Sequence, residues 1–442
     1  MKATADGGAM IRLSIENPAR NETVAQSSVL GNSLQPNALR DLVTAASATR
    51  GRSSQSQIPV IATSQSSSQP TLELPSFGQY QHPFVPTTTL SVLTGCEIAC
   101  SAAQQWAPAD ALRQRGRTIV QLYCDEDVCM QRAAQAMAQF LNCQAITQED
   151  IGAASAMRAY YTRIALQEQM ALANESISLI DAEEEKQSRL QLGGVAAGTD
   201  TSRFERKRLE VADSIIQLEM HDRQLRTLLA HITQFDYTMD QFAQEQLDVR
   251  EISMDLEGLK SFALEHRMDL QGWSHLSRQV NENSAPMFAQ MLTTAVGSWG
   301  IPLPRITPLK KLFCRSDVDY PGLERNMRQE LATITSTHRQ WISQAVEEKY
   351  AKVVMSYQRV AFARQTIDSW QDRIDQLERL ENLGTTQPEQ VAEARATIME
   401  ARSQWITRRL EARSAEIDLA ESVGGIAARC CCGKAWLVTG LE

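Results

Sequence analysis

Apolar residues in the middle of the chain recur in alternating steps of four and three. A mean step of about 3.5 residues puts them on one helix face and predicts a left-handed coiled coil. The pattern predicts a long helix from about Tyr160, a reversal, and a second helix that ends near Ile232. One polar residue, Asp222, lies on the second helix's seam, which consists of Val211, Ile215, Leu218, Asp222, Leu225, Leu229 and Ile232.

The predicted reversal is the segment GGVAAGTDTS, from Gly193 to Ser202. Glycine permits backbone angles that other residues avoid, so a turn is favoured where three glycines lie close together. Ser202 and Glu205 have the spacing of a capping box, which predicts that the second helix begins at this point. The glycines of the turn are Gly193, Gly194 and Gly198.

The same arrangement recurs later in the chain. Its first seam is Val360, Ala363, Ile367, Trp370, Ile374 and Leu377. The turn ENLGTTQPE follows, in which Gly384 can end one helix, and Thr386 with Glu389 can cap the next. The return seam is Val391, Ala394, Ile398, Ala401, Trp405, Arg408, Ala412, Ala415 and Leu419. We interpret the two hairpins as an internal repeat; the alternative is two unrelated helical hairpins.

These patterns predict a mainly α fold, with two tandem repeats of long antiparallel coiled-coil helices and little or no β-structure. The chain is expected to begin with a disordered segment rich in Ser, Thr, Gln and Pro. A Cys-containing helical hairpin, the first repeat, connecting helices with a Pro-rich loop, the second repeat and a Cys-rich tail follow. The expected boundaries are 1–90, 91–149, 150–240, 241–318, 319–425 and 426–442.

Composition narrows the class of function. Aromatic residues make up only 6% of the chain against 43% hydrophobic residues, which suits helices packed through Leu, Ile and Ala. The net charge is −9 and no basic stripe is present, so nucleic-acid binding is excluded. No apolar run reaches the roughly 18 residues that a membrane-spanning helix needs.

Residues Leu93 to Cys96 read Leu-Thr-Gly-Cys, which has the form of a bacterial lipobox. A working lipobox needs a basic and then an apolar segment before it, and the stretch from Phe84 to Gly95 is only weakly apolar. Cys96 is therefore a candidate lipidation site, and the alternative is an ordinary cysteine at the start of a helix.

The cysteines that follow suggest a stapled hairpin. If 97–115 and 117–141 are antiparallel helices that turn near Gly116, two pairs of cysteines can face each other. Disulfides there would require export to an oxidising compartment. Free buried thiols and partial pairing are the alternatives. The predicted pairs are Cys96 with Cys129 and Cys100 with Cys124; the run Cys430, Cys431 and Cys432 has no explanation at this level.

Catalytic motifs are not found. The six histidines show no metal-ligand spacing such as HExxH, and the Gly-rich GGVAAG lacks the Gly-Lys-Ser/Thr ending of a phosphate-binding loop. We therefore expect no enzyme activity, no cofactor and no metal site. The aromatic residues Tyr160, Tyr161, Trp341, Trp370 and Trp405 are interpreted as packing residues.

Two repeats of long helices joined by Gly-containing turns resemble the outer-membrane efflux protein family, the TolC-like channel tunnels. That family carries an Arg-x-Asp-Leu motif between its repeats, and Arg267, Asp269 and Leu270 match it here. Met268 stands where the family usually has proline. GGVAAGTDTSRFERKRLEVAD and ENLGTTQPEQVAEARATIMEAR are similar to the family's Gly turn and Ala-spaced helix. The resemblance covers roughly residues 150–425.

The resemblance implies a passive efflux or export conduit in a bacterial envelope, located in the outer membrane or periplasm. It implies a homotrimer whose coiled coils surround a hollow tube. A periplasmic adaptor and an inner-membrane transporter would meet the periplasmic tip, which Gly193, Gly194, Gly198 and Gly384 would form. A non-transporting envelope scaffold or interaction protein is the alternative function.

One departure from the family concerns the membrane. Family members place two barrel strands ahead of each long helix, but residues 101–150 read as helix and residues 298–316 are rich in proline. We therefore expect these strands to be reduced or missing. Attachment to the outer membrane is expected through a lipid on Cys96, a residual barrel or a partner protein.

Overall fold

The computed structural model describes residues 94–192, 202–233, 247, 255–288, 319–385 and 388–433. All of them belong to one compact unit, Ser68–Glu442. Within these ranges every long element is an α-helix and no strand occurs, so the predicted mainly α fold is confirmed. None of the helices in the described part combines the length and the apolar character needed to cross a membrane.

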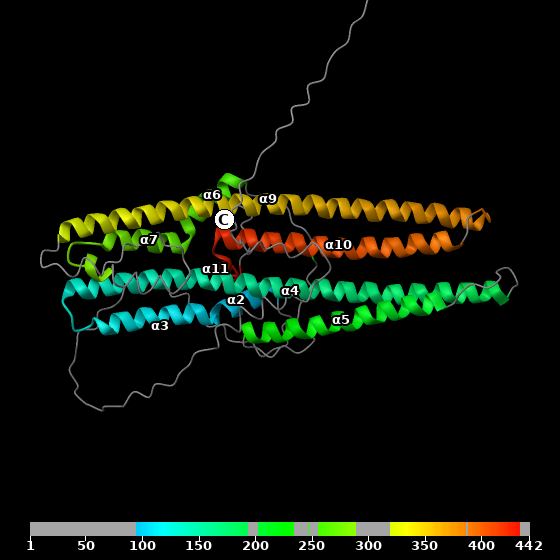
Figure 1. Ribbon diagram of the computed structural model, residues 1–442, viewed down its shortest axis with the longest axis horizontal. Helices are drawn as coiled ribbons and strands as arrows, with labels where there is room; N and C mark the ends of the chain where they lie inside the picture. Colours follow the sequence, from blue (N-terminus) through cyan, green and yellow to red (C-terminus); the bar gives the residue numbers. More distant parts are fainter. Residues whose placement is uncertain are drawn as a thin grey trace, which may run out of the picture. The chain divides into compact units, whose positions relative to one another are not determined.

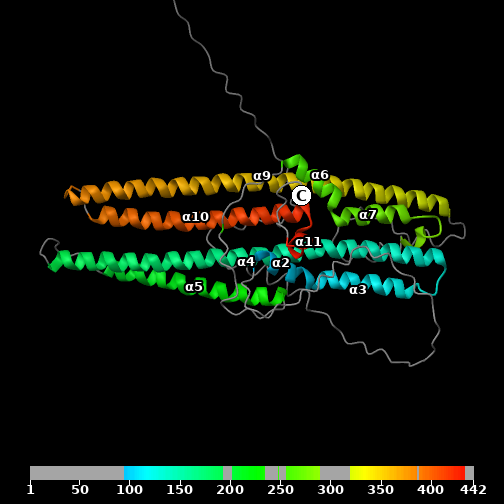
Figure 2. The same cartoon turned by 180° about the vertical axis from the view of Figure 1, so that it is seen from behind.

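Two long helical hairpins dominate the structure (Figure 1). The first pairs α4 (Val128–Leu192) with α5 (Ser202–Thr233), and the second pairs α9 (Tyr320–Asn382) with α10 (Pro388–Val423). Helices α4 and α10 pack against each other, so the four helices lie side by side in the order α5, α4, α10, α9, as the view from behind also shows (Figure 2). The two repeats are therefore joined along α4 and α10.

The predicted seam of the first hairpin is confirmed. Leu225, Leu229 and Ile232 are buried in one core cluster with residues of α4, and Leu218 packs against it. Apolar side chains at this spacing form a stripe on one side of α5, and burying that stripe holds the two helices together. Asp222 lies on the seam as predicted and is buried as well.

The second hairpin also follows its predicted seam. Its turn is a Schellman motif: the N–H of Gly384 donates to the carbonyl of Glu381 at 2.8 Å, and that of Thr385 to Leu380 at 3.0 Å. Gly384 has φ of 72°, a left-handed conformation that glycine adopts without strain. The buried seam residues are Ile374 and Leu377 of α9 and Val391, Ala394, Ile398, Ala401, Ala412, Ala415 and Leu419 of α10.

The predicted N-terminal hairpin is wrong in its turn. Two short helices, α2 (Gly95–Gln104) and α3 (Ala107–Leu122), precede α4. The chain therefore reverses at 123–127 rather than near Gly116. Gly116 lies inside α3 and is buried against α4, where a Cβ would stand 3.4 Å from the backbone of Ala138. The glycine lets the two helices approach closely instead of turning the chain.

Helix α4 crosses the boundary that we expected between residues 149 and 150. No proline interrupts this stretch, and Gly152 lies inside the helix with the ring of Trp106 beside it. A Cβ on Gly152 would stand only 2.8 Å from that ring. From Val128 onwards, the Cys-containing segment and the first long helix are thus one continuous helix.

Three further short helices lie in the connecting segment and after α10. In the connecting segment 241–318, the helical stretch is broken at Arg267, whose ψ of 122° is extended, into α6 (Leu256–His266) and α7 (Met268–Gln279). After α10, Gly424 and Gly425 adopt φ of 88° and 84° and redirect the chain into α11 (Ile426–Cys431). Helix α11 packs on α2 and α4.

Several predictions lie outside the described residues. They are the disordered segment 1–90, the turn with Gly193, Gly194 and Gly198, the Pro-rich stretch 298–316 and the last residues of the tail.

Candidate functional site: the seam between the two hairpins

A row of ion pairs joins α4 to α10. Three arginines lie seven residues apart on α10, so they share one helix face. Each reaches a glutamate of α4, with nitrogen–oxygen distances of 2.8, 2.7 and 2.6 Å. The pairs, named here the turn-side ladder, are Arg409–Glu168, Arg402–Glu175 and Arg395–Glu183.

The middle pair of the ladder is more exposed than the pair at its Arg409 end. The Arg409 side chain is only 8% exposed, its guanidinium lies over the ring of Trp405, and it also donates to the carbonyl of Leu247 at 3.2 Å. The Arg402 side chain is 42% exposed. A buried pair is costly to break, whereas a hydrated pair contributes little. The middle of the ladder is therefore weaker than its Arg409 end.

Near the hairpin turns the ladder also includes α9. Arg395 bridges Glu183 of α4 and Glu378 of α9, and its pKa is raised mainly by the hydrogen bond to Glu378. Lys186 of α4 reaches Glu381 of α9 at 2.5 Å. Both hairpins are thus connected close to their tips.

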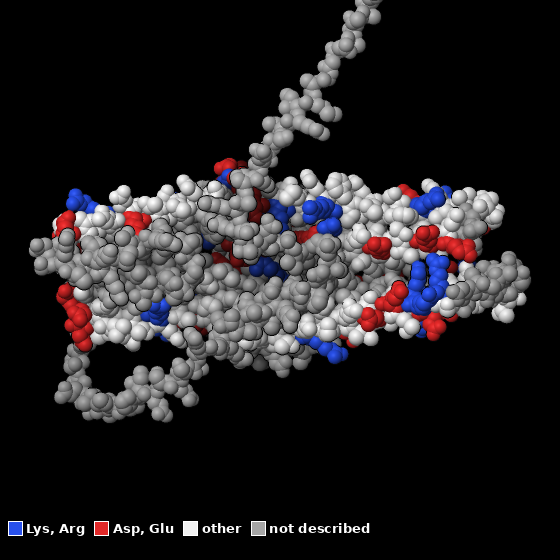
Figure 3. Space-filling model, in the orientation of Figure 1, with Lys and Arg blue, Asp and Glu red and all other residues white. Residues whose placement is uncertain are grey.

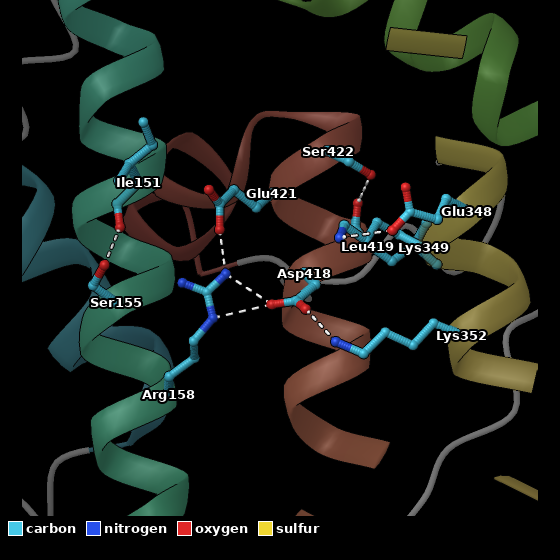
Figure 4. Close-up of polar contacts among 10 residues, drawn as sticks. All are labelled: Ile151, Ser155, Arg158, Glu348, Lys349, Lys352, Asp418, Leu419, Glu421 and Ser422. Atoms are coloured by element: carbon cyan, nitrogen blue, oxygen red, sulfur yellow. Dashed lines mark hydrogen bonds and ion pairs between the residues drawn. The ribbon is translucent and has the colours of Figure 1, made fainter. Parts of the chain in front are cut away.

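At the other end of the seam, Arg158 of α4 inserts between two carboxylates of α10 (Figure 4). It donates to Asp418 at 2.9 and 3.1 Å and pairs with Glu421, while Lys352 of α9 binds the second oxygen of Asp418 at 2.8 Å. Burial alone would raise the pKa of Asp418, but Arg158 and Lys352 lower it overall. Three helices are therefore tied to one carboxylate.

The motif residues Arg267, Asp269 and Leu270 lie at the same end. Arg267 donates to both oxygens of Asp269, at 3.1 and 2.6 Å, and to the carbonyl of Ser422 at 2.7 Å. His338 of α9 contacts Asp269 at 2.9 Å. Leu270 is buried in a cluster formed with α9 and α10. The motif therefore joins α7 to the second hairpin.

Asp269 is almost fully buried, and burial opposes its ionisation. The hydrogen bonds from His338 and Arg267 outweigh burial and hold the pKa of Asp269 well below its usual range. The carboxylate is therefore charged and compensated, the condition under which a buried ion pair is stable.

Asp150 of α4 completes this end of the seam. Its oxygens accept the N–H groups of Gly425 and Ala427, at 2.8 and 2.9 Å, where α11 begins. Burial raises the pKa of Asp150 to about 6, although these bonds and Arg267 act to lower it. We name Asp150, Arg158, Arg267, Asp269 and Asp418 the inner joint.

A similar pair lies inside the first hairpin. Arg163 of α4 donates to Asp222 of α5 at 2.8 Å, both side chains are buried, and Arg226 binds the other oxygen of Asp222. The polar seam position thus fixes the register between α4 and α5, because a shift along the helix would leave a buried charge without its partner.

The predicted cysteine pairing is wrong. Cys96 is bonded to Cys430 and Cys100 to Cys431, with Cα atoms 4.8 and 5.0 Å apart. Cys124 and Cys129 are not disulfide-bonded. They lie at the α3–α4 reversal, since α3 runs past Gly116, and the partners of α2 come instead from α11.

Lipidation of Cys96 competes with this pairing, because both use the same sulfur atom. The lipobox residues also have another explanation. Thr94 and Glu97 form a capping box at the start of α2: Thr94 Oγ1 accepts the N–H of Glu97 at 3.3 Å, and Glu97 accepts the N–H of Thr94 at 2.6 Å. The structure thus favours the alternative of a cysteine at a helix start.

Most aromatic residues pack as predicted, with one exception. Tyr160 and Tyr161 are buried behind the start of α2, where a Cβ on Gly95 would stand 3.2 Å from both residues. Trp370 and Trp405 are half-buried. Trp341 is 57% exposed and stacks on the ring of His338. It is not a core residue.

Acidic and basic side chains are interspersed on the face in Figure 3, and they gather toward the hairpin turns. Within the described ranges, no group of His, Cys, Asp and Glu could hold a metal ion. The seam as described holds the two hairpins together. The ladder was missed in the sequence, although the seven-residue spacing of Arg395, Arg402 and Arg409 was a readable signal.

Comparison with known proteins gives matches in structure alone. No known protein-family model matches the sequence. No curated protein matches it either. The chain is similar to the outer membrane channel CmeC of Campylobacter jejuni, at 8% identity and a TM-score of 0.56, over 75% of this chain and 85% of that chain.

Two further solved structures show the same similarity. One is CusC, whose structures concern folding and transmembrane channel formation. It is 10% identical to this chain with a TM-score of 0.56, over 75% of this chain and 92% of that chain. The open state of the outer membrane channel MtrE of Neisseria gonorrhoeae has 13% identity and a TM-score of 0.53, over 75% and 89%. The sequence resemblance is thus confirmed at the level of architecture: the chain has the fold of TolC-like outer-membrane efflux channels.

Proposed function

We propose that this protein is a TolC-like component of a bacterial envelope export system, and that it acts as a passive conduit. The observation that carries the proposal is the pair of long hairpins joined along the seam, which is shared with CmeC, CusC and MtrE. The solved neighbours are channels rather than enzymes, and we place this chain with them in the outer membrane or periplasm.

The conduit requires several copies, because one row of four helices is open at both edges and does not enclose a channel. Helices α5 and α9 form these edges, and each carries exposed apolar side chains on the described surface. Those of α5 lie on the side turned away from α4, since they are spaced seven and four residues apart opposite the seam. They are Leu209, Ile216 and Met220 on α5, and Trp341, Met355 and Phe362 on α9.

The two edges also match in height along the hairpins. Arg208 lies level with Asp181 of α4, and Arg395 bridges Glu183 of α4 and Glu378 of α9. At about 1.5 Å per residue, Met220 is about 18 Å from Arg208 along α5, and Phe362 about 24 Å from Glu378 along α9. Glu183 is nearer the turn than Asp181 by about 3 Å. Met220 and Phe362 therefore differ in height along the hairpins by only about 3 Å.

A contact between α5 of one copy and α9 of the next is head-to-tail, and such contacts close into a ring when the rotation allows it. We propose three copies, as the family resemblance implies, with the hairpin turns forming a periplasmic tip. A periplasmic adaptor and an inner-membrane transporter would meet the ring there. Energy would come from the transporter, and this chain would supply the walled path.

The experiment that tests the ring is cysteine cross-linking between copies. Met220→Cys and Phe362→Cys are combined in a chain whose exposed Cys124 and Cys432 are replaced by serine. Oxidation should give a covalent trimer on non-reducing gels. The matched control pairs Met220→Cys with Val354→Cys, since Val354 is exposed but lies about 12 Å farther from the turn along α9 than Phe362 and should not cross-link.

Export is tested separately in a strain from which the gene has been removed. Two results together would support the conduit. The intact chain restores substrate efflux, and the oxidised, cross-linked chain that also carries a charged residue at Ile216 does not. A trimer that restores nothing would instead identify the envelope scaffold, and a monomer would overturn the ring altogether.

A further inference from the structure

The two disulfides join the first described helix to the last one. Cys96 and Cys100 lie one helical turn apart on α2, and Cys430 and Cys431 lie side by side on α11. Since α2 packs on α4 and α11 follows α10, the bonds fasten the inner end of one hairpin to that of the other. The run of adjacent cysteines thereby has an explanation, because neighbouring residues of α11 meet neighbouring turns of α2.

In the unfolded chain, the positions of the cysteines along the sequence disfavour this pairing. Cys96 and Cys430 are separated by 334 residues, whereas Cys100, Cys124 and Cys129 follow Cys96 closely. In an unfolded chain the chance of contact falls as about the three-halves power of loop length. Cys96 therefore meets Cys124 roughly 40 times as often as it meets Cys430. Oxidation before folding favours local, non-native pairs.

Once the helices are packed, the preference reverses. Cys100 and Cys430 are buried at 6% exposure, and the Cα atoms of the two pairs are held only 4.8 and 5.0 Å apart. Cys143, the remaining cysteine nearby in sequence, is partly buried on α4, and burial raises the pKa of its thiol to about 11, so it is a poor nucleophile. Native pairing is thus stable after folding but disfavoured before it.

We propose that this chain is a substrate of a thiol–disulfide isomerase, which converts local disulfides into the pair of bonds between α2 and α11. The inference goes beyond the proposed conduit and shares with it only export to an oxidising compartment. The partner is defined by its chemistry: a dithiol protein that binds unfolded chains and exchanges disulfides.

The exchange balances without net oxidation. A thiolate of the isomerase attacks Cys96 in a Cys96–Cys124 disulfide, which forms a mixed disulfide and releases Cys124 as a thiolate. The thiolate of Cys430 then attacks Cys96, which forms the native bond and returns the isomerase thiolate. The earlier oxidation removes two electrons and two protons for each bond, and glutathione disulfide accepts them in the test tube and becomes two molecules of glutathione.

The experiment compares two orders of events with the full chain. In one, the reduced and denatured chain is oxidised by glutathione disulfide before folding is allowed; in the other, it folds in reductant and is then oxidised. Peptides joined by disulfides are counted by mass spectrometry, with and without a purified bacterial isomerase. We expect the isomerase to raise native pairing at least fivefold when oxidation comes first, and less than twofold when folding comes first.

Efficient native pairing without isomerase in the oxidation-first arm would overturn the proposal, and so would a folded chain that never joins Cys96 to Cys430. If the reduced chain does not fold, pairing is measured instead in cells with and without their isomerase, where a several-fold loss is expected. The variant Cys124→Ser/Cys129→Ser removes the local competitors and should recover part of that loss; unchanged pairing in the deficient cells overturns the proposal. Neither assay measures efflux, so failure of the proposed conduit function would not change the outcome of this test.

Discussion

The inner joint and the turn-side ladder connect the same pair of hairpins but differ in environment. At the inner joint, Asp150 and Asp269 are buried and each carboxylate is met by several donors. In the ladder, Arg402 and Glu175 are both nearly half-exposed and meet only once. Buried, multiply bonded charges fix a geometry, while hydrated pairs exchange with water at little cost. The inner joint is therefore the more rigid connection, and the Arg402–Glu175 pair in the middle of the ladder is the weakest contact of the seam.

The largest expected effect is at the motif carboxylate. Asp269→Asn removes a buried charge that compensates Arg267 and His338, so we expect the free energy of unfolding to fall by about 3 kcal/mol. Urea denaturation measures it. Glu257→Gln is the control, since Glu257 is 79% exposed and pairs only with Lys260. Equal effects of the two changes would remove the distinction between the inner joint and the surface.

A smaller effect is expected from pH at Asp150. Its pKa in the folded protein is raised to about 6, against about 3.9 in the unfolded chain, so folding takes up a proton between these values. The contribution of Asp150 to stability is therefore fully present below about pH 4 and is lost as the pH rises through 6, by about 2–3 kcal/mol.

The comparison of the intact chain with Asp150→Asn isolates this contribution, because asparagine does not titrate. The gap in unfolding free energy between the two proteins should change between pH 7 and pH 5, with the intact chain gaining on the variant as the pH falls. A gap that stays constant would show that burial of Asp150 is compensated by Gly425, Ala427 and Arg267.

The smallest expected effect separates two pairs of the ladder. Arg409→Ala should cost about 2 kcal/mol, because Arg409 is buried and also binds the carbonyl of Leu247. Arg402→Ala should cost less than about 1 kcal/mol and nothing in about 1 M NaCl, since salt screens exposed pairs. Thermal and urea unfolding at two salt concentrations measure both. If salt also reduced the loss of stability caused by Arg409→Ala, the expected difference between the buried and the exposed pair would be contradicted.

The hairpins could be predicted from the sequence because their information is local. The seam of α5, the Schellman turn at Gly384 and the return stripe of α10 each follow from residues close together in the chain. Arg267, Asp269 and Leu270 were found through family resemblance, and the structure supplies their contacts.

The predictions were wrong where one residue type can serve two different structural roles. Gly116 was interpreted as a turn, yet glycine also permits close helix contact, and only the packing of α3 on α4 decides between them. The cysteine pairs were assigned to near neighbours, but the partners of Cys96 and Cys100 lie more than 330 residues away. Nothing in the spacing of two distant cysteine groups states that α11 returns to α2.

The separation in sequence across the seam has a further consequence. Arg158 and Glu421 are 263 residues apart, and Arg409 and Glu168 are 241 apart, while each hairpin is made from contacts between adjacent helices. Folding rates fall as the mean sequence separation of contacts rises. We therefore expect the hairpins, whose contacts are closer in sequence, to form before they dock along α4 and α10.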